Sequence, residues 1–374
     1  MDFEKLTREE VLTVRPYAPG KPVEELQRER GLDSVFKLAS NENPYGPGPA
    51  VLEAIAKAAA DLNRYPDDCV FYLYRALAEH LGVDEERILI GGGSVEILYM
   101  IGTAFVKPED TLVYATPSFV IYDIVSRISA GQGIPVPTDE RFCHDLPAMA
   151  KAVDDRTKIV FIANPNNPTG TYNTSEELEA FLEAVPQEVL VAVDEAYYEY
   201  VDAPDYPQTL EWLDRFPNLI VLRSFSKLHS LAGIRIGYSI SHPDVKGILE
   251  RVRVPFNVNS IAQAAALASL GDTDRQRPIV EANRAALDHV TKELTRLGCR
   301  VLPSQTNFVM AFLPIAANVA FEGLLDRGVI IRPMGSFGSD TDAVRISVGR
   351  SEENERLIAA LEDILAAQPA DSPR

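Results

Sequence analysis

The sequence contains only three cysteines, Cys69, Cys143 and Cys299, and none of them is part of a C-x-x-C pair. An odd number of widely separated cysteines indicates reduced thiols in a cytoplasmic protein. The histidines are also few and show no H-E-x-x-H or other metal-ligand spacing, so no metal site is predicted. No apolar run approaches the roughly 18 residues that span a bilayer, and the charged start MDFEKLTREE lacks the apolar stretch of a signal peptide. We therefore expect a soluble protein that is not exported.

Positive charge is scarce as well. The 36 lysines and arginines are outnumbered by 55 aspartates and glutamates, which gives a formal net charge of -19. Such a chain repels phosphate backbones and anionic lipids, so neither nucleic acid nor a membrane surface is an expected partner. If the ligand is an anionic small molecule, positive charge has to be concentrated locally around it.

Apolar runs and amphipathic stretches alternate between about residues 48 and 240. The runs TLVYA and KIVFIA are each followed by a helical pattern, and the near-continuous apolar run VLVAV indicates burial on both faces of a sheet. Strands separated by helices favour parallel pairing through right-handed crossovers. The fold class predicted for this region is α/β, as a large doubly wound domain with a mostly parallel sheet.

The pattern changes after Pro255. Long helical segments are followed there by the short strands RVLP, NFVMAFL and AVRISVG, which indicates a smaller α+β domain. The expected division is an N-terminal arm over residues 1–45 that packs on the smaller domain, a large domain over 46–255 and a small C-terminal domain over 256–374.

Polar residues at the carboxyl ends of the predicted strands are the best candidates for a ligand site, because ligands bind beyond those ends in open parallel sheets. The segments in question are GGGS at 91–94, NPNNPTG at 164–170, DEAY at 194–197 and SFSK at 224–227. GGGS follows a strand and opens a helix, so its backbone N–H groups can bind a phosphate. A glycine-rich turn without a ligand is the alternative. The sequence has neither the third glycine of G-x-G-x-x-G nor a P-loop.

Asp194 ends an apolar run, where an ionised carboxylate is costly to bury unless it meets a positive partner. The protonated pyridine nitrogen of pyridoxal 5′-phosphate (PLP) is such a partner. A metal-binding aspartate is the alternative. Tyr197 is placed to hydrogen-bond the 3′ oxygen of the same ring, or else it is an aromatic packing residue.

Lys227 lies just beyond the next strand, between Ser224 and Ser226 and eight residues before Arg235. Two hydroxyls and a guanidinium near a lysine form a compact phosphate clamp. The lysine is then placed to reach an aldehyde carbon on the same ligand. This pattern favours a cofactor-bearing lysine over a solvated one.

Nine segments carry a resemblance to a known family. They are, in order over essentially the whole chain, PYAPGKPVEEL, LASNENPYGPG, RYPD, GGGS, NPNNPTG, VDEAY, SFSKLHSLAGIRIGY, PFNVN and RISVG. In this combination the sequence resembles the histidinol-phosphate aminotransferase branch of the fold-type I PLP enzymes. The resemblance implies that Lys227 forms a Schiff base with PLP, that Asp194 pairs with the pyridine nitrogen and that Phe119 stacks on the ring. It also implies a homodimer in which Tyr65 of one subunit reaches the cofactor phosphate of the other. The remaining implied cofactor contacts are Tyr197 and Asn167 at the 3′ oxygen, and Gly93, Ser94, Val95, Ser224, Ser226 and Arg235 at the phosphate.

For the substrate, the resemblance implies that Arg345 binds an α-carboxylate and that Arg332 and Tyr17 bind a substrate phosphate. Structural ion pairs are the alternative for both arginines. The implied reaction is a reversible, ping-pong amino transfer between histidinol phosphate and 2-oxoglutarate, in which Lys227 acts as general acid and base.

Two departures from the family pattern concern the substrate more than the cofactor. Val95 stands where many relatives have aspartate, and Leu228 and His229 follow the lysine where small and aromatic residues are frequent. Three alternatives therefore stay open: an aromatic amino acid aminotransferase, a threonine-phosphate decarboxylase, and a PLP-binding regulatory module without chemistry.

Overall fold

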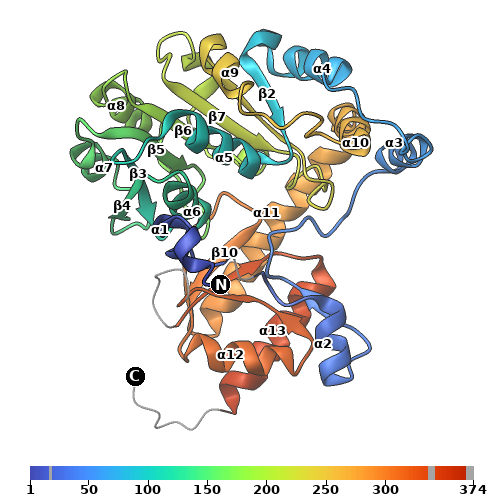
Figure 1. Ribbon diagram of the computed structural model, residues 1–374. Coiled ribbons are helices and arrows are strands. Elements are labelled where there is room, and N and C mark those ends of the chain that lie inside the picture. The colour runs from blue at the N-terminus through green and yellow to red at the C-terminus, as the bar shows by residue number, and fades with distance from the viewer. Residues whose placement is uncertain (17–18, 336–341, 368–374) are drawn as a thin grey trace.

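The computed structural model describes residues 1–16, 19–335 and 342–367. A seven-stranded sheet forms the larger part of the molecule (Figure 1). Its strands are β2 (Ile88–Gly91), β3 (Thr111–Thr116), β4 (Gln132–Pro137), β5 (Thr157–Ala163), β6 (Leu190–Asp194), β7 (Leu219–Ser224) and β8 (Gly237–Ser241), in the order β2-β8-β7-β6-β5-β3-β4. Only β8 runs against its neighbours, so the sheet is mostly parallel, as predicted.

Helices cover both faces of this sheet. One face packs against α3 (Pro49–Ala59), α4 (Phe71–Leu81), α7 (Leu146–Ala152), α8 (Ser175–Ala184) and α10 (Ser260–Leu270), and the other packs against α5 (Ser94–Phe105), α6 (Ile121–Ile128) and α9 (Pro243–Leu249). In β5, Val160 and Ile162 enter the first core while Ile159 and Phe161 enter the second. Both faces of the strand are therefore buried, which explains its continuous apolar sequence. Short 3-10 turns complete this part: η2 (Glu85–Arg87), η3 (Tyr198–Tyr200) and η4 (Thr209–Trp212).

The smaller part is an antiparallel sheet covered by helices. Its strands are β9 (Arg300–Val301), β10 (Phe308–Phe312), β12 (Arg332–Pro333) and β13 (Ala343–Ser347), in the order β12-β13-β10-β9. Its core is filled from α11 (Thr273–Arg296), α12 (Ala317–Leu325) and α13 (Ser351–Ala366). Helix α11 runs from the larger part into the smaller one (Figure 1). None of the helices in the described ranges is long and apolar enough to cross a membrane.

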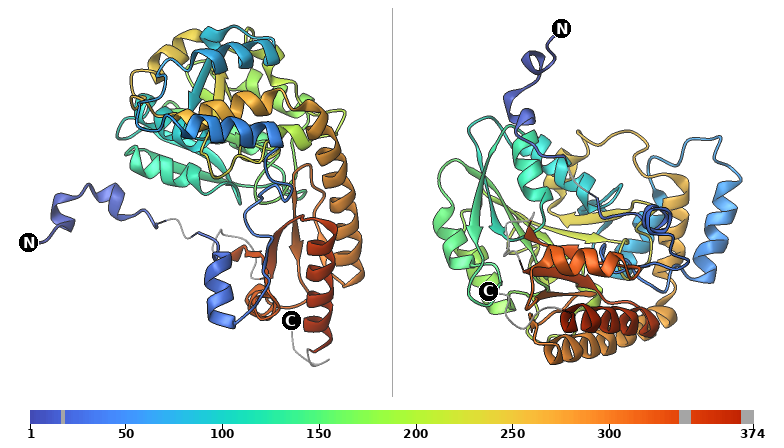
Figure 2. Two further views of the ribbon diagram at one scale, coloured as in Figure 1. Left: turned by 90° about the vertical axis from the view of Figure 1, so that its right-hand side faces the viewer. Right: turned by 90° about the horizontal axis from the view of Figure 1, so that it is seen from below.

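The N-terminal segment contacts both parts. Helix α2 (Val23–Arg30) and strand β1 (Phe36–Lys37) pack on the smaller part, where β1 pairs in parallel with β11 (Val329–Ile330). The preceding η1 (Glu4–Leu6) and α1 (Glu9–Leu12) extend away from the smaller part (Figure 2), and α1 contacts α6 of the larger part, where Arg8 Nη2 donates to the carbonyl oxygen of Ile128 at 2.7 Å. Helix α10 packs closely on α3 and α4, so this segment after residue 255 shares the core of the large sheet, in contrast to the expected division.

The strand order brings the predicted ligand-binding segments to one edge. β2 and β7 are each antiparallel to β8, so they run in the same direction, and Gly91 and Ser224 both pair with Gly237. A Cβ added at Gly237 would lie 2.6 Å from the backbone nitrogen of Ser94, which explains why glycine is needed there. The strand ends that carry Ser94, Asp194 and Ser224 consequently open side by side toward the smaller sheet.

A buried ion pair lies directly behind this edge. Arg223 on β7 is 5% exposed, and its Nε and Nη2 donate to Glu195 Oε2 at 3.0 and 2.9 Å. The other carboxylate oxygen accepts from Thr209 Oγ1 at 2.7 Å, and the guanidinium lies 3.5 Å from the centre of the Tyr198 ring. Both charges are thus compensated in a buried environment.

Arg223→Met should lower the free energy of unfolding by about 3–5 kcal/mol, because it leaves the Glu195 carboxylate buried without a cation. Urea unfolding of the cofactor-free protein measures this change. Arg296 pairs with Glu362 at 2.8 Å on the exposed surface and provides the matched control, Arg296→Met, for which we expect little change. Equal losses for the two variants would show that the buried pair contributes no more than a surface pair.

Candidate active site

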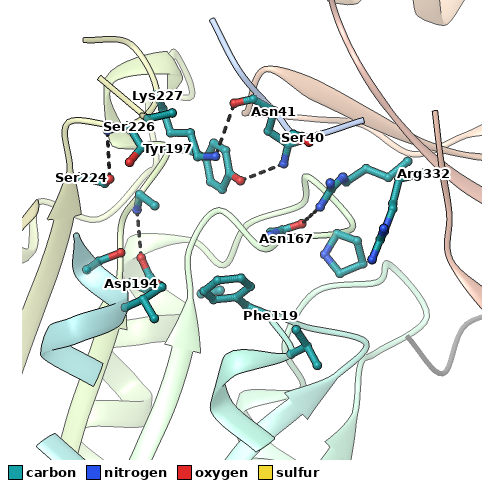
Figure 3. Close-up of a pocket in the computed structure, with 18 of the residues that line it drawn as sticks. Ser40, Asn41, Phe119, Asn167, Asp194, Tyr197, Ser224, Ser226, Lys227 and Arg332 are labelled. Carbon is teal, nitrogen blue, oxygen red and sulfur yellow. Dashed lines mark hydrogen bonds between the residues drawn. The ribbon is translucent and has the colours of Figure 1, made fainter. Parts of the chain in front are cut away.

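A cavity of about 290 Å³ lies where the strand ends of the large sheet face the smaller sheet. The structure brings most of the residues predicted for the site to this one cavity. Those that line it are Ser94, Val95, Phe119, Asn167, Asp194, Tyr197, Ser224, Ser226, Lys227, Arg235, Arg332 and Arg345. In Figure 3, Ser224 and Ser226 lie at the opposite end of the cavity from Arg332.

Lys227 follows β7 and points toward Asn41 and Tyr197 (Figure 3). Its Nζ donates to the carbonyl oxygen of Asn41 at 3.4 Å and lies 5.2 Å from the centre of the Tyr197 ring. The Tyr197 hydroxyl accepts from Asn41 Nδ2 at 2.9 Å, and Phe308 packs edge-on against the Tyr197 ring. Asn41 therefore holds the lysine and the tyrosine in a fixed relation to each other.

Asp194 ends β6 and is 5% exposed. Its Oδ1 accepts from the backbone N–H of Ala196 at 3.2 Å, and its Oδ2 accepts from the Tyr122 hydroxyl at 3.1 Å. Burial raises the pKa of the Asp194 carboxyl to about 6, although these two donors and the nearby Lys227 each lower it. The described residues thus compensate the negative charge of this carboxylate only in part, and a cationic ligand group would complete the compensation.

Backbone and side-chain donors form a cup at the other end of the cavity. Helix α5 begins at Ser94, so the unpaired N–H groups of its first turn and its dipole favour an anion. The Arg235 Nη1 donates to Ser226 Oγ at 3.4 Å, and the N–H of Ser226 donates to Ser224 Oγ at 3.0 Å. Gly93 has a φ of +93°, and a Cβ there would lie 2.4 Å from Arg235 Nη2. Only glycine leaves room for the arginine beside the helix start.

Two arginines from the smaller sheet close the cavity. Arg332 on β12 and Arg345 on β13 occupy directly paired positions in the antiparallel sheet, so both point to the same face. Arg345 Nη1 donates to Asn167 Oδ1 and its Nη2 donates to the carbonyl oxygen of Ala39, each at 2.6 Å. Like charges on opposed positions repel each other, and an anionic ligand in the cavity relieves this repulsion.

These groups fit PLP in their chemistry. The cup of N–H, hydroxyl and guanidinium donors suits a phosphate, and the buried Asp194 suits a protonated ring nitrogen. Phe119, which packs edge-on against Tyr122 at 5.8 Å between ring centres, presents an apolar surface to the cavity. Among the described residues, no group of three or more histidine, cysteine, aspartate or glutamate side chains is placed to hold a metal.

Of the predicted residues that the structure describes, Gly93 and Tyr65 are not among those that line this cavity. Tyr65 is 82% exposed and stacks on Phe256 at 4.6 Å, and it does not line the cavity of its own chain. Tyr17 lies outside the described residues.

Sequence reasoning missed two residues that the geometry makes important, Asn41 and Tyr122. Asn41 lies in the NENPYG segment, whose residue types are those of an ordinary turn, and its backbone has a φ of +54°. Its side chain and backbone also bond to Ser347 and Asn307 of the smaller part, so it links both parts to Lys227. Tyr122 occupies an apolar position in the IYDIVSRI helix, where its pattern is that of an ordinary core residue.

Comparison with known proteins agrees with this geometry. The family model described as aminotransferase class I and II matches residues 33–361. The chain is 46% identical to histidinol-phosphate aminotransferase 1 of Nitrosococcus oceani over 97% of this chain and 98% of the relative. It is 44% identical to histidinol-phosphate aminotransferase of Moorella thermoacetica, over 96% of this chain and 93% of the relative.

The same likeness extends to a solved structure. The crystal structure of histidinol-phosphate aminotransferase from Sinorhizobium meliloti in complex with pyridoxal-5′-phosphate superposes with a TM-score of 0.87 at 30% identity, and the match covers 96% of this chain and 97% of that one. The chain therefore belongs to the class I and II aminotransferase family and is a PLP-dependent transaminase.

Proposed function

We propose that this protein is a histidinol-phosphate aminotransferase that moves the amino group of histidinol phosphate to 2-oxoglutarate, reversibly and by a ping-pong sequence. The observation that carries the proposal is the convergence of Lys227, Asp194 and a phosphate cup with two opposed arginines in one cavity. The full-length likeness to histidinol-phosphate aminotransferases supports the choice of substrate.

Each residue at the cofactor has a distinct task in this proposal. PLP, when bound, supplies an aldehyde carbon for the amino group and a ring that withdraws electrons. Asp194 pairs with its ring nitrogen, and Phe119 covers its ring. Its 3′ oxygen is bound by Tyr197 and Asn167. Its phosphate is held by Gly93, Ser94, Val95, Ser224, Ser226 and Arg235. Held by these residues, the cofactor would lie within reach of Lys227.

Lys227 acts first as the covalent anchor of the cofactor and then as a base and acid. When the amino group of the substrate takes its place, the freed Nζ stays near the reacting carbon because its backbone follows a buried strand. Placed there, Lys227 would act as the base that takes a proton from the substrate Cα and as the acid that gives it back. The carbonyl oxygen of Asn41, 3.4 Å from Nζ, holds the amine in place between these steps.

The two arginines distinguish the two substrates. Arg345 presents a planar guanidinium that suits the α-carboxylate of glutamate and 2-oxoglutarate. Histidinol phosphate has no α-carboxylate, but it has a phosphate, which Arg332 and Tyr17 bind in this proposal. An anion therefore enters the positively charged end of the cavity in both half-reactions.

The active form in this proposal is a cytoplasmic homodimer with two shared sites. Tyr65 and Phe256 stack on each other at the surface, and the neighbouring Tyr72 and Val254 are 73% and 62% exposed. Large apolar side chains exposed in this way are typical of a protein interface. In the dimer, the Tyr65 hydroxyl of one subunit reaches the cofactor phosphate of the other.

Arg332→Leu tests the choice of substrate most sharply. The variant should lose about 2–4 kcal/mol in kcat/KM for histidinol phosphate, because a desolvated phosphate loses a charge-assisted partner. For unphosphorylated histidinol, the same substitution should lower kcat/KM far less. Steady-state kinetics of the unmodified enzyme, of Arg332→Leu and of the control Arg300→Leu measure the difference, since Arg300 lies on β9 away from the cavity lining.

The same assay with other amino donors separates the alternative functions. The unmodified enzyme should convert histidinol phosphate faster than phenylalanine, and threonine phosphate should release no carbon dioxide. Faster turnover of phenylalanine, or equal losses for histidinol and its phosphate in Arg332→Leu, favours an aromatic aminotransferase. Carbon dioxide from threonine phosphate favours a decarboxylase, and no turnover of any donor favours a regulatory module.

Mixed dimers test the shared site. Lys227→Ala and Tyr65→Phe chains should each be impaired as homodimers, and mixing them should restore activity to about a quarter of the unmodified level after random exchange of subunits. One site of each mixed dimer then carries both defects and the other carries neither. Activity is measured after the subunits are exchanged and the mixed dimer is confirmed by mass spectrometry. If mixed dimers form and stay as impaired as their parents, each site lies within one chain.

A further inference from the structure

Tyr122 lies beside Asp194 and, like it, belongs to the lining of the cavity. It comes from α6, is completely buried, and places its hydroxyl 3.1 Å from Asp194 Oδ2. Its ring stacks on Phe161 of β5, with ring centres 5.0 Å apart and an angle of 9° between the planes. Phe119, which lines the cavity, packs edge-on against Tyr122, with ring centres 5.8 Å apart. The tyrosine is clamped between the core and the cavity, so its hydroxyl has a fixed direction.

The charges around Asp194 make this hydroxyl a donor. Burial and the adjacent Asp194 carboxylate raise the pKa of Tyr122 well above its usual value, so the phenol keeps its proton. The other ionisable groups near Asp194 are Lys227, Tyr197 and Glu195. Glu195 accepts from Arg223 and Thr209, and the Tyr197 hydroxyl accepts from Asn41; among the described residues neither is hydrogen-bonded to Asp194. Tyr122 and the N–H of Ala196 are the donors that the described residues direct at the carboxylate.

We propose that Tyr122 is a positioning residue for the reaction, whose hydroxyl orients the Asp194 carboxylate and keeps it ionised opposite the ring nitrogen of the cofactor. The inference rests on the cofactor-binding part of the proposed function and is independent of the choice of substrate. With one oxygen held by Tyr122 and the other by Ala196, the carboxylate cannot rotate, and its remaining lone pairs face the cavity.

Removal of the hydroxyl has two physical consequences. Asp194 loses one of two donors that stabilise its charged form, so its carboxylate becomes more basic and draws the shared proton away from the ring nitrogen. The ring then carries less positive charge. The nitrogen that joins Lys227 to the cofactor consequently keeps its own proton to a higher pH, because a nearby positive charge no longer opposes protonation as strongly.

Tyr122→Phe tests this role, and Tyr114→Phe is its matched control. Tyr114 belongs to the same core, and its hydroxyl donates to the Asp123 carboxylate at 2.8 Å, away from the cavity lining. Two quantities are measured without any substrate: the dissociation constant of PLP from the protein, and the pH midpoint at which the visible absorption of the loaded protein changes. Tyr122→Phe should weaken PLP binding roughly tenfold and raise the midpoint by about half a pH unit or more.

Tyr114→Phe should change neither quantity appreciably, even if both variants lose similar thermal stability. Values for Tyr122→Phe equal to those of the unmodified protein, or equal shifts in both variants, would overturn the proposal. Combining each change with Asp194→Asn supplies a second criterion. In that background Tyr122→Phe should alter PLP binding by less than about twofold, since the hydroxyl acts through Asp194. A further tenfold loss there would show that Tyr122 acts by another route.

These outcomes are separate from the substrate assignment. If PLP binds as expected and Tyr122→Phe shifts the midpoint, the inference holds even if phenylalanine proves to be the better donor. If histidinol phosphate is the substrate and the midpoint does not move, the proposed function stands without the role of Tyr122.

Discussion

The carboxylate of Asp194, buried at the end of a central strand where that strand meets the cavity, is the constraint on which the site depends. Burial raises the pKa of this group to about 6. In the cofactor-free protein its ionisation therefore costs stability as the pH rises from about 4 to about 6, and the loss approaches about 3 kcal/mol above that range. A protonated ring nitrogen removes this penalty. The same feature that destabilises the empty protein thus selects a cationic ring, and the tyrosine beside it determines how the carboxylate faces that ring.

A second constraint is that the site lies between two separately packed cores. The large sheet supplies the lysine, the aspartate and the phosphate cup, whereas Arg332 and Arg345 come from the smaller sheet. Contacts across this boundary are specific: Arg345 bonds to Asn167, and Asn41 bonds to Tyr197 and Ser347. In the proposed function, the substrate anion therefore contacts the smaller part and the cofactor the larger one, so that amino transfer requires both.

The sequence predicted those site residues that directly follow an apolar strand. Lys227, Asp194 and the glycines before Ser94 follow apolar strands, and the end of a parallel strand is a position that sequence reasoning can locate. Asn41 could not be found in this way, because its partner Lys227 is 186 residues away and only the packing of the N-terminal segment joins them. Tyr122 resembles any aromatic core residue in its helix. The antiparallel β8 and the packing of α10 with the large sheet were also missed, since both depend on contacts between distant segments.

The central claim is that a positive ring nitrogen compensates Asp194. The nitrogen-15 chemical shift of PLP labelled at its ring nitrogen, measured in the loaded protein near pH 8, tests it directly. The account predicts a shift in the range of protonated pyridine for the unmodified protein and in the range of neutral pyridine for Asp194→Ala. A neutral ring nitrogen in the unmodified protein would contradict the account.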